Sequence, residues 1–249
     1  TEALRRIGRT LRVLIEGPSH HPHTNGGATN CLPYLQYIRH MRQRPEIVAS
    51  LDSPAADLES SYLDHLQRPL QPLCDNLEFS TYETFEKDPV KYAEYQKATH
   101  MAVSDFASTY STKVISILVA GAGRGPLVTA ALKAVVGSKV SSQISIYAVE
   151  KNPSAVVYLQ SMARHDPLWK RFNVVVVEAD MRDMKRSMVN VVADIVITEL
   201  LGSFGDNELS PECIESLYKT GCIRQSCVCI PSHYASYLAP VSSLRLHSE

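Results

Sequence analysis

The sequence predicts an α/β fold in which helices cover a parallel, Rossmann-like sheet. Three observations predict it. From about residue 113 onward, apolar runs suited to buried strands alternate with helix-like segments, the first run leads directly into a glycine-rich loop, and the later strands end in acidic residues. Right-handed crossovers bring such strand ends to one edge of the sheet, where open α/β folds bind ligands.

Each element follows from its own stretch of sequence. Pro126 fits the first turn of a helix, where no backbone N–H is needed. Ser210, Pro211 and Glu212 are typical of another helix start, with an N-cap, a first-turn proline and an acid that favours the helix dipole. The expected strands span residues 114–119, 144–149, 173–177 and 194–198, and two expected helices span residues 127–136 and 155–164.

The residues before this domain have a different character. The apolar run at 11–15 predicts a strand and residues 34–44 predict a helix, but one strand and one helix cannot bury a core alone. Prolines among polar residues at 50–73 predict a linker, with one helix at 58–66. We therefore expect the end of an upstream domain at 1–49, the linker, and the α/β domain at 74–249.

Composition and charge exclude several classes of protein. The chain has 249 residues, of which 45% are hydrophobic and 20% are charged, and its net charge is −1. The composition excludes a disordered tail and a coiled coil. The net charge provides no positive electrostatic field that would attract a nucleic-acid backbone. The six cysteines form no Cys-x-x-Cys pair, so we expect reduced thiols and no metal site. The start at Thr1, without a signal segment or a membrane-spanning run, suggests an intracellular piece of a longer polypeptide.

The glycine-rich loop at residues 121–125 and the acids after the next two strands suit an adenosine-containing ligand. Glycines let the backbone approach the ligand, and Glu150 can accept both ribose hydroxyls. Dinucleotide dehydrogenases share this weak signal. The Gly-x-Gly-x-Gly spacing, and the carboxylate of Asp180 with the amide of Met181 for an adenine edge, favour S-adenosylmethionine over NAD. The alternative for Glu150 is a solvated strand end.

An acidic loop follows the fourth strand. Glu199 and Glu208 lie nine positions apart, and Gly202 and Gly205 allow the segment between them to fold back. Two carboxylates alone would repel each other, whereas two around one guanidinium would be satisfied by its five donors. Residues 178–215 hold nine acidic and three basic side chains, a local balance of 3 − 9 = −6 that suits a cationic peptide. The alternative is a solvated loop that leads into a helix.

Three stretches carry a resemblance to a known family. They are Gly-Ala-Gly-Arg-Gly-Pro-Leu at 121–127, Tyr-Ala-Val-Glu-Lys-Asn-Pro at 147–153, and Glu-Leu-Leu-Gly-Ser-Phe-Gly-Asp-Asn-Glu-Leu-Ser-Pro-Glu-Cys at 199–213. The chain resembles the protein arginine methyltransferase five family, whose type II enzymes form symmetric dimethylarginine. The resemblance covers most of residues 11–249. It implies a class I S-adenosylmethionine-dependent methyltransferase domain, preceded by a remnant of a TIM barrel and without the family's C-terminal β-barrel.

The resemblance also implies roles for residues. Glu199 and Glu208 would clamp the substrate arginine, and Phe85 would select the symmetric product. Without the family, Tyr82, Phe85 and Tyr92 indicate a core-facing helical stripe. The resemblance assigns Tyr82, Lys91 and Tyr92 to an N-terminal lid over the methyl donor, S-adenosylmethionine, which leaves as S-adenosylhomocysteine. The donor would also be bound by Gly121, Gly123, Arg124, Gly125, Pro126, Leu127, Glu150, Asp180 and Met181.

The expected function is methyl transfer from S-adenosylmethionine to arginine in histone tails and Arg-Gly-rich splicing factors, with symmetric dimethylation. The resemblance implies a WD-repeat partner on the N-terminal barrel, a homo-oligomer at full length, and a place in cytoplasm and nucleus, with no membrane or nucleic-acid binding. Two alternatives stay open. One is a non-catalytic fragment that binds the donor or a partner, and the more distant one is an NAD-dependent oxidoreductase.

Overall fold

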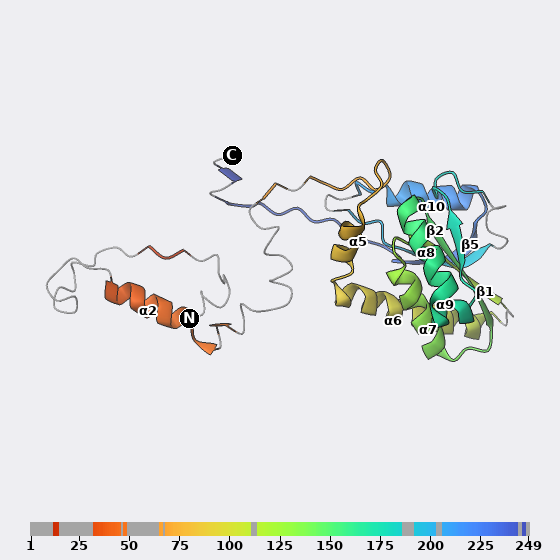
Figure 1. Cartoon of the computed structure of the whole chain (residues 1–249), viewed down its shortest axis with the longest axis horizontal. Coiled ribbons are helices and arrows are strands. Elements are labelled where there is room, and N and C mark those ends of the chain that lie inside the picture. Colours follow the sequence, from red (N-terminus) through yellow and green to blue (C-terminus); the bar gives the residue numbers. More distant parts are fainter. Residues whose placement is uncertain are drawn as a thin grey trace. The chain divides into compact units, whose positions relative to one another are not determined.

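The computed structural model divides the chain into two compact units, residues 1–67 with 241–249, and residues 68–240 (Figure 1). The first unit contains α2 (Leu32–Arg42), close to the helix predicted at 34–44. Residues 12–14 are not in a strand, so the strand predicted there is wrong, and the helix predicted at 58–66 lies almost wholly outside the described residues. The structure describes residues 12–14, 32–45, 47–48, 65–66, 68–110, 114–185, 192–202, 206–243 and 246–247.

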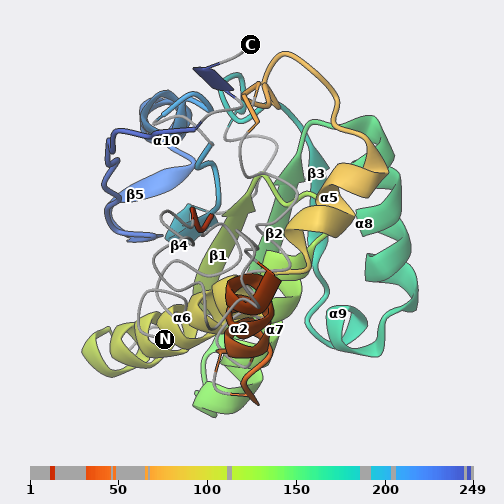
Figure 2. The ribbon, with the colours of Figure 1, turned by 90° about the vertical axis from the view of Figure 1, so that its left-hand side faces the viewer.

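The second unit is built on a five-stranded sheet with the order β3-β2-β1-β4-β5, visible from right to left in Figure 2. All four strand pairs are parallel, which confirms the predicted fold class. The four predicted strands are present within two residues of their expected bounds. The fifth strand was missed. The strands are β1 (Val114–Ala120), β2 (Gln143–Glu150), β3 (Val175–Glu178), β4 (Ala193–Thr198) and β5 (Ile223–Ile230).

Helices cover both faces of this sheet. Apolar side chains from α6, α7, α8 and α9 form the core on one face, and those from α10 form the core on the other. No helix in the described part of the chain is long and apolar enough to cross a membrane. The helices are α5 (Phe79–Phe85), α6 (Pro89–Thr109), α7 (Pro126–Ser138), α8 (Pro153–His165), α9 (Pro167–Arg171) and α10 (Ser210–Lys219).

The helix starts share one local design. A proline occupies the first or second position of α6 to α10, where its missing N–H is not needed. The side chains of Asp88, Asn152 and Asp166 accept backbone N–H groups at three of these starts. The predicted N-cap at Ser210 is wrong by one position. Ser210 is the first helical residue, and Leu209, in a left-handed conformation with φ 54°, precedes it without a side-chain cap.

The glycine-rich loop connects β1 to α7 in a conformation that few side chains permit. Gly125 has a φ of +90°, and a Cβ on it would lie 2.6 Å from the ring of Trp169, which is fully buried. The Trp169 indole N–H donates to the Thr129 hydroxyl at 3.1 Å. A side chain at position 125 is therefore excluded both by the backbone conformation and by the Trp169 ring.

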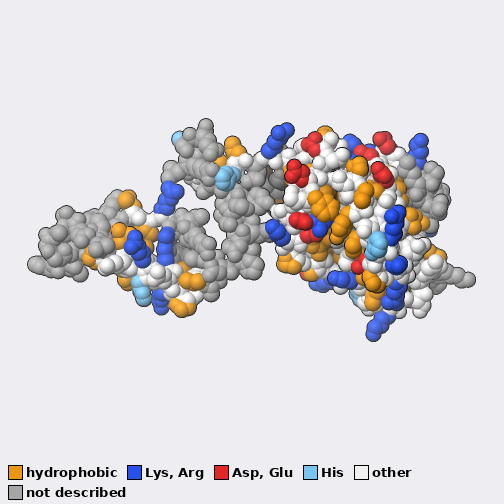
Figure 3. Space-filling model, viewed as in Figure 1, with side chains coloured by type: hydrophobic (Ala, Val, Ile, Leu, Met, Phe, Trp, Pro, Cys, Tyr) orange, Lys and Arg blue, Asp and Glu red, His pale blue; other side chains and the backbone are white. Residues whose placement is uncertain are grey.

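The surface of the second unit mixes charges of both signs. On the face shown in Figure 3, acidic, basic and apolar side chains are all exposed. The five free cysteines of the described residues include two that are buried, Cys213 and Cys222.

We predict that Gly125→Ala destabilises the second unit by about 2 kcal/mol or more, because the new methyl group meets both a left-handed backbone and the Trp169 ring. The matched control is Gly137→Ala in α7. A Cβ there would lie 3.5 Å from the His100 ring, an ordinary contact, so we expect stabilisation by about 0.5 kcal/mol. Urea unfolding followed by circular dichroism measures both. Equal effects at the two sites would contradict the packing described for Gly125.

Candidate functional site

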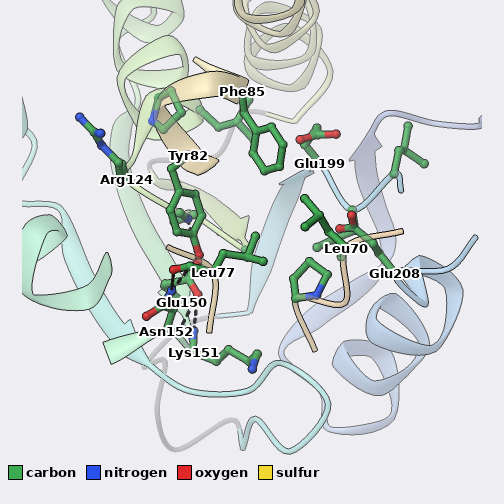
Figure 4. Close-up of a pocket in the computed structure, with 18 of the residues that line it drawn as sticks. Leu70, Leu77, Tyr82, Phe85, Arg124, Glu150, Lys151, Asn152, Glu199 and Glu208 are labelled. Carbon is green, nitrogen blue, oxygen red and sulfur yellow. Dashed lines mark hydrogen bonds between the residues drawn. The ribbon is translucent and has the colours of Figure 1, made fainter. Parts of the chain in front are cut away.

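A cavity of about 310 Å³ opens at the carboxyl ends of β1, β2 and β4. Figure 4 shows Glu150 and Asn152 at one end, Glu199 and Glu208 at the other, and Tyr82 and Phe85 along the side between them. The predicted site residues line this cavity, with the exception of Gly125, which faces Trp169. One hollow therefore joins the glycine-rich loop to the acidic loop.

The buried carboxylate of Glu150 organises the first end. Its Oε1 accepts the backbone N–H groups of Lys151 and Asn152, both at 2.8 Å, and its Oε2 accepts that of Gly123 at 2.7 Å. Glu150 is only 7% exposed, so its interpretation as a solvated strand end is wrong. A carboxylate has about four acceptor positions. Three are filled from the backbone, which leaves one for a hydroxyl group in the cavity and not the two that the sequence predicted.

The acid after β3 has a partner of its own. The Arg182 guanidinium donates to both oxygens of Asp180, at 3.0 and 2.6 Å, and the Arg182 backbone N–H donates to it at 2.9 Å. The Arg182 hydrogen bond is the main reason that the pKa of Asp180 is lowered. Asp180 is therefore held as an oriented carboxylate on the wall of the cavity, next to the buried Met181.

Helix α5 covers the glycine-rich loop. A Cβ on Gly123 would lie 3.1 Å from the Tyr82 ring, so the ring packs where a side chain would otherwise be. The Tyr82 hydroxyl accepts the side-chain N–H of Asn152 at 3.1 Å. Burial, followed by the charge of Glu150, raises the pKa of Tyr82. Tyr82 therefore stays a neutral phenol that joins α5 to the start of α8.

Arg124 connects the same loop to the outer side of α5. Its guanidinium lies 4.3 Å from the Phe79 ring centre and 5.2 Å from that of Tyr158. It forms ion pairs with Glu83 at 2.8 Å and Glu86 at 3.3 Å. In Figure 4 the side chain points away from the two acidic loop carboxylates. Arg124 thus connects α5 to the glycine-rich loop through contacts on the side away from the acidic loop.

The other end of the cavity contains a carboxylate, an ammonium group and two aromatic rings. Lys91 Nζ lies 3.4 Å from Glu199 Oε2, 5.6 Å from the Phe85 ring centre and 5.1 Å from that of Tyr92. The Tyr95 hydroxyl donates to the carbonyl of Thr198 at 2.8 Å and so holds the end of β4 directly before Glu199. Carboxylates and aromatic faces both attract cations. This end of the cavity is accordingly a cation site, and Lys91 provides the cation.

At this end of the cavity, the surroundings of Glu208 disfavour its ionised form. Burial, followed by the negative charge of Glu199, raises its pKa to about 7, while Lys91 acts in the opposite direction. Near neutral pH the side chain therefore exchanges between an acid and a carboxylate. A second cation in the cavity would favour the carboxylate form.

The aromatic residues of the lid do not form one core-facing stripe. Tyr82 and Phe85 lie on α5, which has no buried residue, whereas Tyr92 lies on α6 and packs against the core with part of its surface. Asn152 and Leu70 also line the cavity, although neither was predicted as a site residue. Asn152 had a local signal, since an asparagine before Pro153 is typical of a helix start. Leu70 had none.

Comparisons with known proteins agree on one family. The model of the PRMT5 arginine-N-methyltransferase family matches residues 53–230. Protein arginine N-methyltransferase 5 of Xenopus laevis is 42% identical and covers 96% of this chain and 35% of its own length. Protein arginine N-methyltransferase skb1 of Schizosaccharomyces pombe is 46% identical and covers 78% of this chain and 29% of its own length. The chain spans about a third of the length of these curated relatives.

A solved structure is similar at a lower level. The plantazolicin methyltransferase BpumL, in complex with a monoazolic desmethylPZN analog and SAH, has a TM-score of 0.41 and 15% sequence identity, and the match covers 72% of this chain and 57% of that chain.

We predict that two substitutions move the pKa of Glu208 in opposite directions. Glu199→Gln removes a negative neighbour and lowers it, whereas Lys91→Met removes a positive neighbour and raises it above about 7. A ¹³C NMR titration of the glutamate carboxyl groups, with Glu208→Gln to assign the signal, measures both. Shifts in the same direction would contradict this arrangement of charges.

The same pKa gives a pH dependence of stability. Between about pH 4.5, the ordinary value, and about pH 7, folded Glu208 keeps a proton that the unfolded chain has released. The contribution of this group to the free energy of unfolding therefore falls as the pH rises through that window and is constant above it. Thermal unfolding at several pH values should show a smaller fall in Glu208→Gln than in the original chain.

Proposed function

The chain belongs to the PRMT5 arginine-N-methyltransferase family, and from that premise we propose that it binds S-adenosylmethionine and transfers its methyl group to arginine side chains of proteins, with symmetric dimethylarginine as the product. One observation carries the proposal. A single cavity has an acceptor suited to a ribose at Glu150 and two carboxylates suited to a guanidinium at Glu199 and Glu208. A methyl donor and an arginine that enter from these two ends would meet inside it.

The residues at the first end fit the donor. Glu150 retains an acceptor position for a ribose hydroxyl, and Gly121 and Gly123, both with positive φ, bring the backbone to the cavity wall without side chains of their own. Asp180 offers a carboxylate and Met181 a backbone amide for an adenine edge. When bound, S-adenosylmethionine supplies an electrophilic methyl group on a sulfonium ion.

The two glutamates at the other end prepare the nucleophile. A guanidinium is protonated at any ordinary pH and delocalises its lone pairs, so it must be both positioned and polarised. Glu199 and Glu208 would hold the positive charge toward one side and leave the other terminal nitrogen more nucleophilic. The nitrogen loses a proton once it carries the methyl group. Glu208 is our candidate for the acceptor, because burial and the negative charge of Glu199 both raise its affinity for a proton.

A second candidate function is donor binding without transfer. It is favoured by the share of the relatives' length that this chain spans, about a third. The same consideration makes the wider organisation a proposal. We infer the end of a TIM barrel at residues 1–49, a linker at 50–73, a WD-repeat partner on that barrel, a homo-oligomer, and action on histones and Arg-Gly-rich proteins in the cytoplasm and nucleus.

We predict that the chain binds S-adenosylmethionine in preference to NAD and that Glu150→Gln weakens the binding roughly tenfold or more, because an amide places N–H groups against backbone donors. The matched control is Glu178→Gln. Glu178 is paired with Glu150 in register at the end of β3, but it is exposed and does not line the cavity. Isothermal titration calorimetry measures the binding of S-adenosylmethionine and of NAD to the original chain, Glu150→Gln and Glu178→Gln. Tighter binding of NAD would support an oxidoreductase instead.

We predict transfer of a radiolabelled methyl group to an Arg-Gly-rich peptide and at least a tenfold loss of rate in Glu208→Gln.

Phe85→Met should reduce the symmetric fraction of the dimethylarginine, because a flexible side chain replaces the ring beside the cation site. Mass spectrometry of the product separates the two isomers. Donor binding without transfer would support the second candidate, and a wholly symmetric product from Phe85→Met would remove the role proposed for Phe85.

A further inference from the structure

One wall of the cavity is formed by residues that precede α5, which we name the wall segment (residues 68–77). Leu70 and Leu77 of this segment line the cavity. The segment is tied to the rest of the unit near both ends. The Asn152 side chain donates to the carbonyl of Leu77 at 3.0 Å, and the Asn207 side chain donates to that of Leu70 at 2.9 Å. The first tie is at the Glu150 end of the cavity, and the second is in the acidic loop.

The Asn207 side chain packs against Gly202. A Cβ on Gly202 would collide with the Asn207 amide, so the missing side chain of Gly202 is what allows the amide to lie there. The same amide then reaches the Leu70 carbonyl. Asn207 is therefore held between its own loop and the wall segment, which is 137 positions away in the sequence.

Glu208 is fixed on both sides by this arrangement. On one side is Asn207 with its bond to Leu70. On the other side is Leu209, which has a left-handed backbone, donates to the Asp206 carbonyl at 3.0 Å and accepts the N–H of Cys213 at 3.1 Å. Figure 4 shows the Glu208 side chain and Leu70 on the same side of the cavity. Hydrogen bonds thus fix both chain neighbours of Glu208, and with them the direction in which its side chain leaves the backbone.

Such support is needed because Glu208 and Glu199 repel each other when no second cation is present. The simplest relief would be for Glu208 to swing out into solvent. A neutral amide is suited to prevent this, since it bonds a carbonyl without adding another charge to the acidic loop.

We propose that Asn207 is a positioning residue for the arginine site, which holds Glu208 inside the cavity by packing against Gly202 and donating a hydrogen bond to the Leu70 carbonyl, so that the wall segment is part of the substrate site. The inference rests on the proposed function for the role of Glu208. It places the arginine side chain between the two glutamates, against the wall that Leu70 forms.

The test is a ¹³C NMR titration of Glu208 in the 249-residue chain, which requires neither donor nor substrate. In Asn207→Ala, Glu208 gains water, and its midpoint should fall from about 7 by about one pH unit or more toward its ordinary value. The matched control is Asn76→Ala, which removes an exposed amide from the same wall segment and should leave the midpoint unchanged.

Gly202→Ala is an independent second variant, because it displaces the Asn207 amide without removing it. It should lower the midpoint in the same direction. Thermal unfolding shows which variants remain folded. Midpoints equal to that of the original chain in both folded variants would overturn the proposal. If the chain fails to bind S-adenosylmethionine, the proposed function fails, while the titration still decides the role of Asn207.

Discussion

The site depends on one buried carboxylate, Glu150, that accepts three backbone hydrogen bonds. Glu150 binds the N–H of Gly123 with one oxygen and those of Lys151 and Asn152 with the other, so the loop after β1 and the turn after β2 become one rigid piece. Asn152 then extends this piece outward, because its side chain bonds both Tyr82 on the lid and Leu77 on the wall segment. The lid and the wall are therefore both positioned from the end of a single buried strand.

The opposite end of the cavity is organised by charge that is not fully balanced. Glu199 has Lys91 beside it, whereas Glu208 lies within the field of both. The ammonium group of Lys91 takes the position between a carboxylate and aromatic rings that a guanidinium would require under the proposed function. An incoming arginine would have to displace this group from Glu199. A guanidinium offers more hydrogen-bond donors than the primary amine that it would displace.

The sequence predicted those features whose cause is local. β1 and β4 are buried on both faces and appear as continuous apolar runs, which is why their bounds were predicted closely. β5 was missed because it lies at the edge of the sheet, where Arg224, Gln225 and Ser226 are exposed and interrupt the apolar pattern. The contact between Asn207 and Leu70 had no signal at all, since it joins residues that only the complete fold brings together. The acids at the strand ends were predictable by position, but their partners, such as Arg182 for Asp180, were not.

The packing of Trp169 against Gly125 gives the molecule a spectroscopic property. Trp169 is the only tryptophan in the sequence, and it is fully buried. Its ring touches the glycine-rich loop two positions after the backbone N–H that Glu150 holds. Its emission therefore arises from a single environment. An intrinsic fluorophore is thus placed behind the loop, where it reports on the order of the ligand edge without an added label.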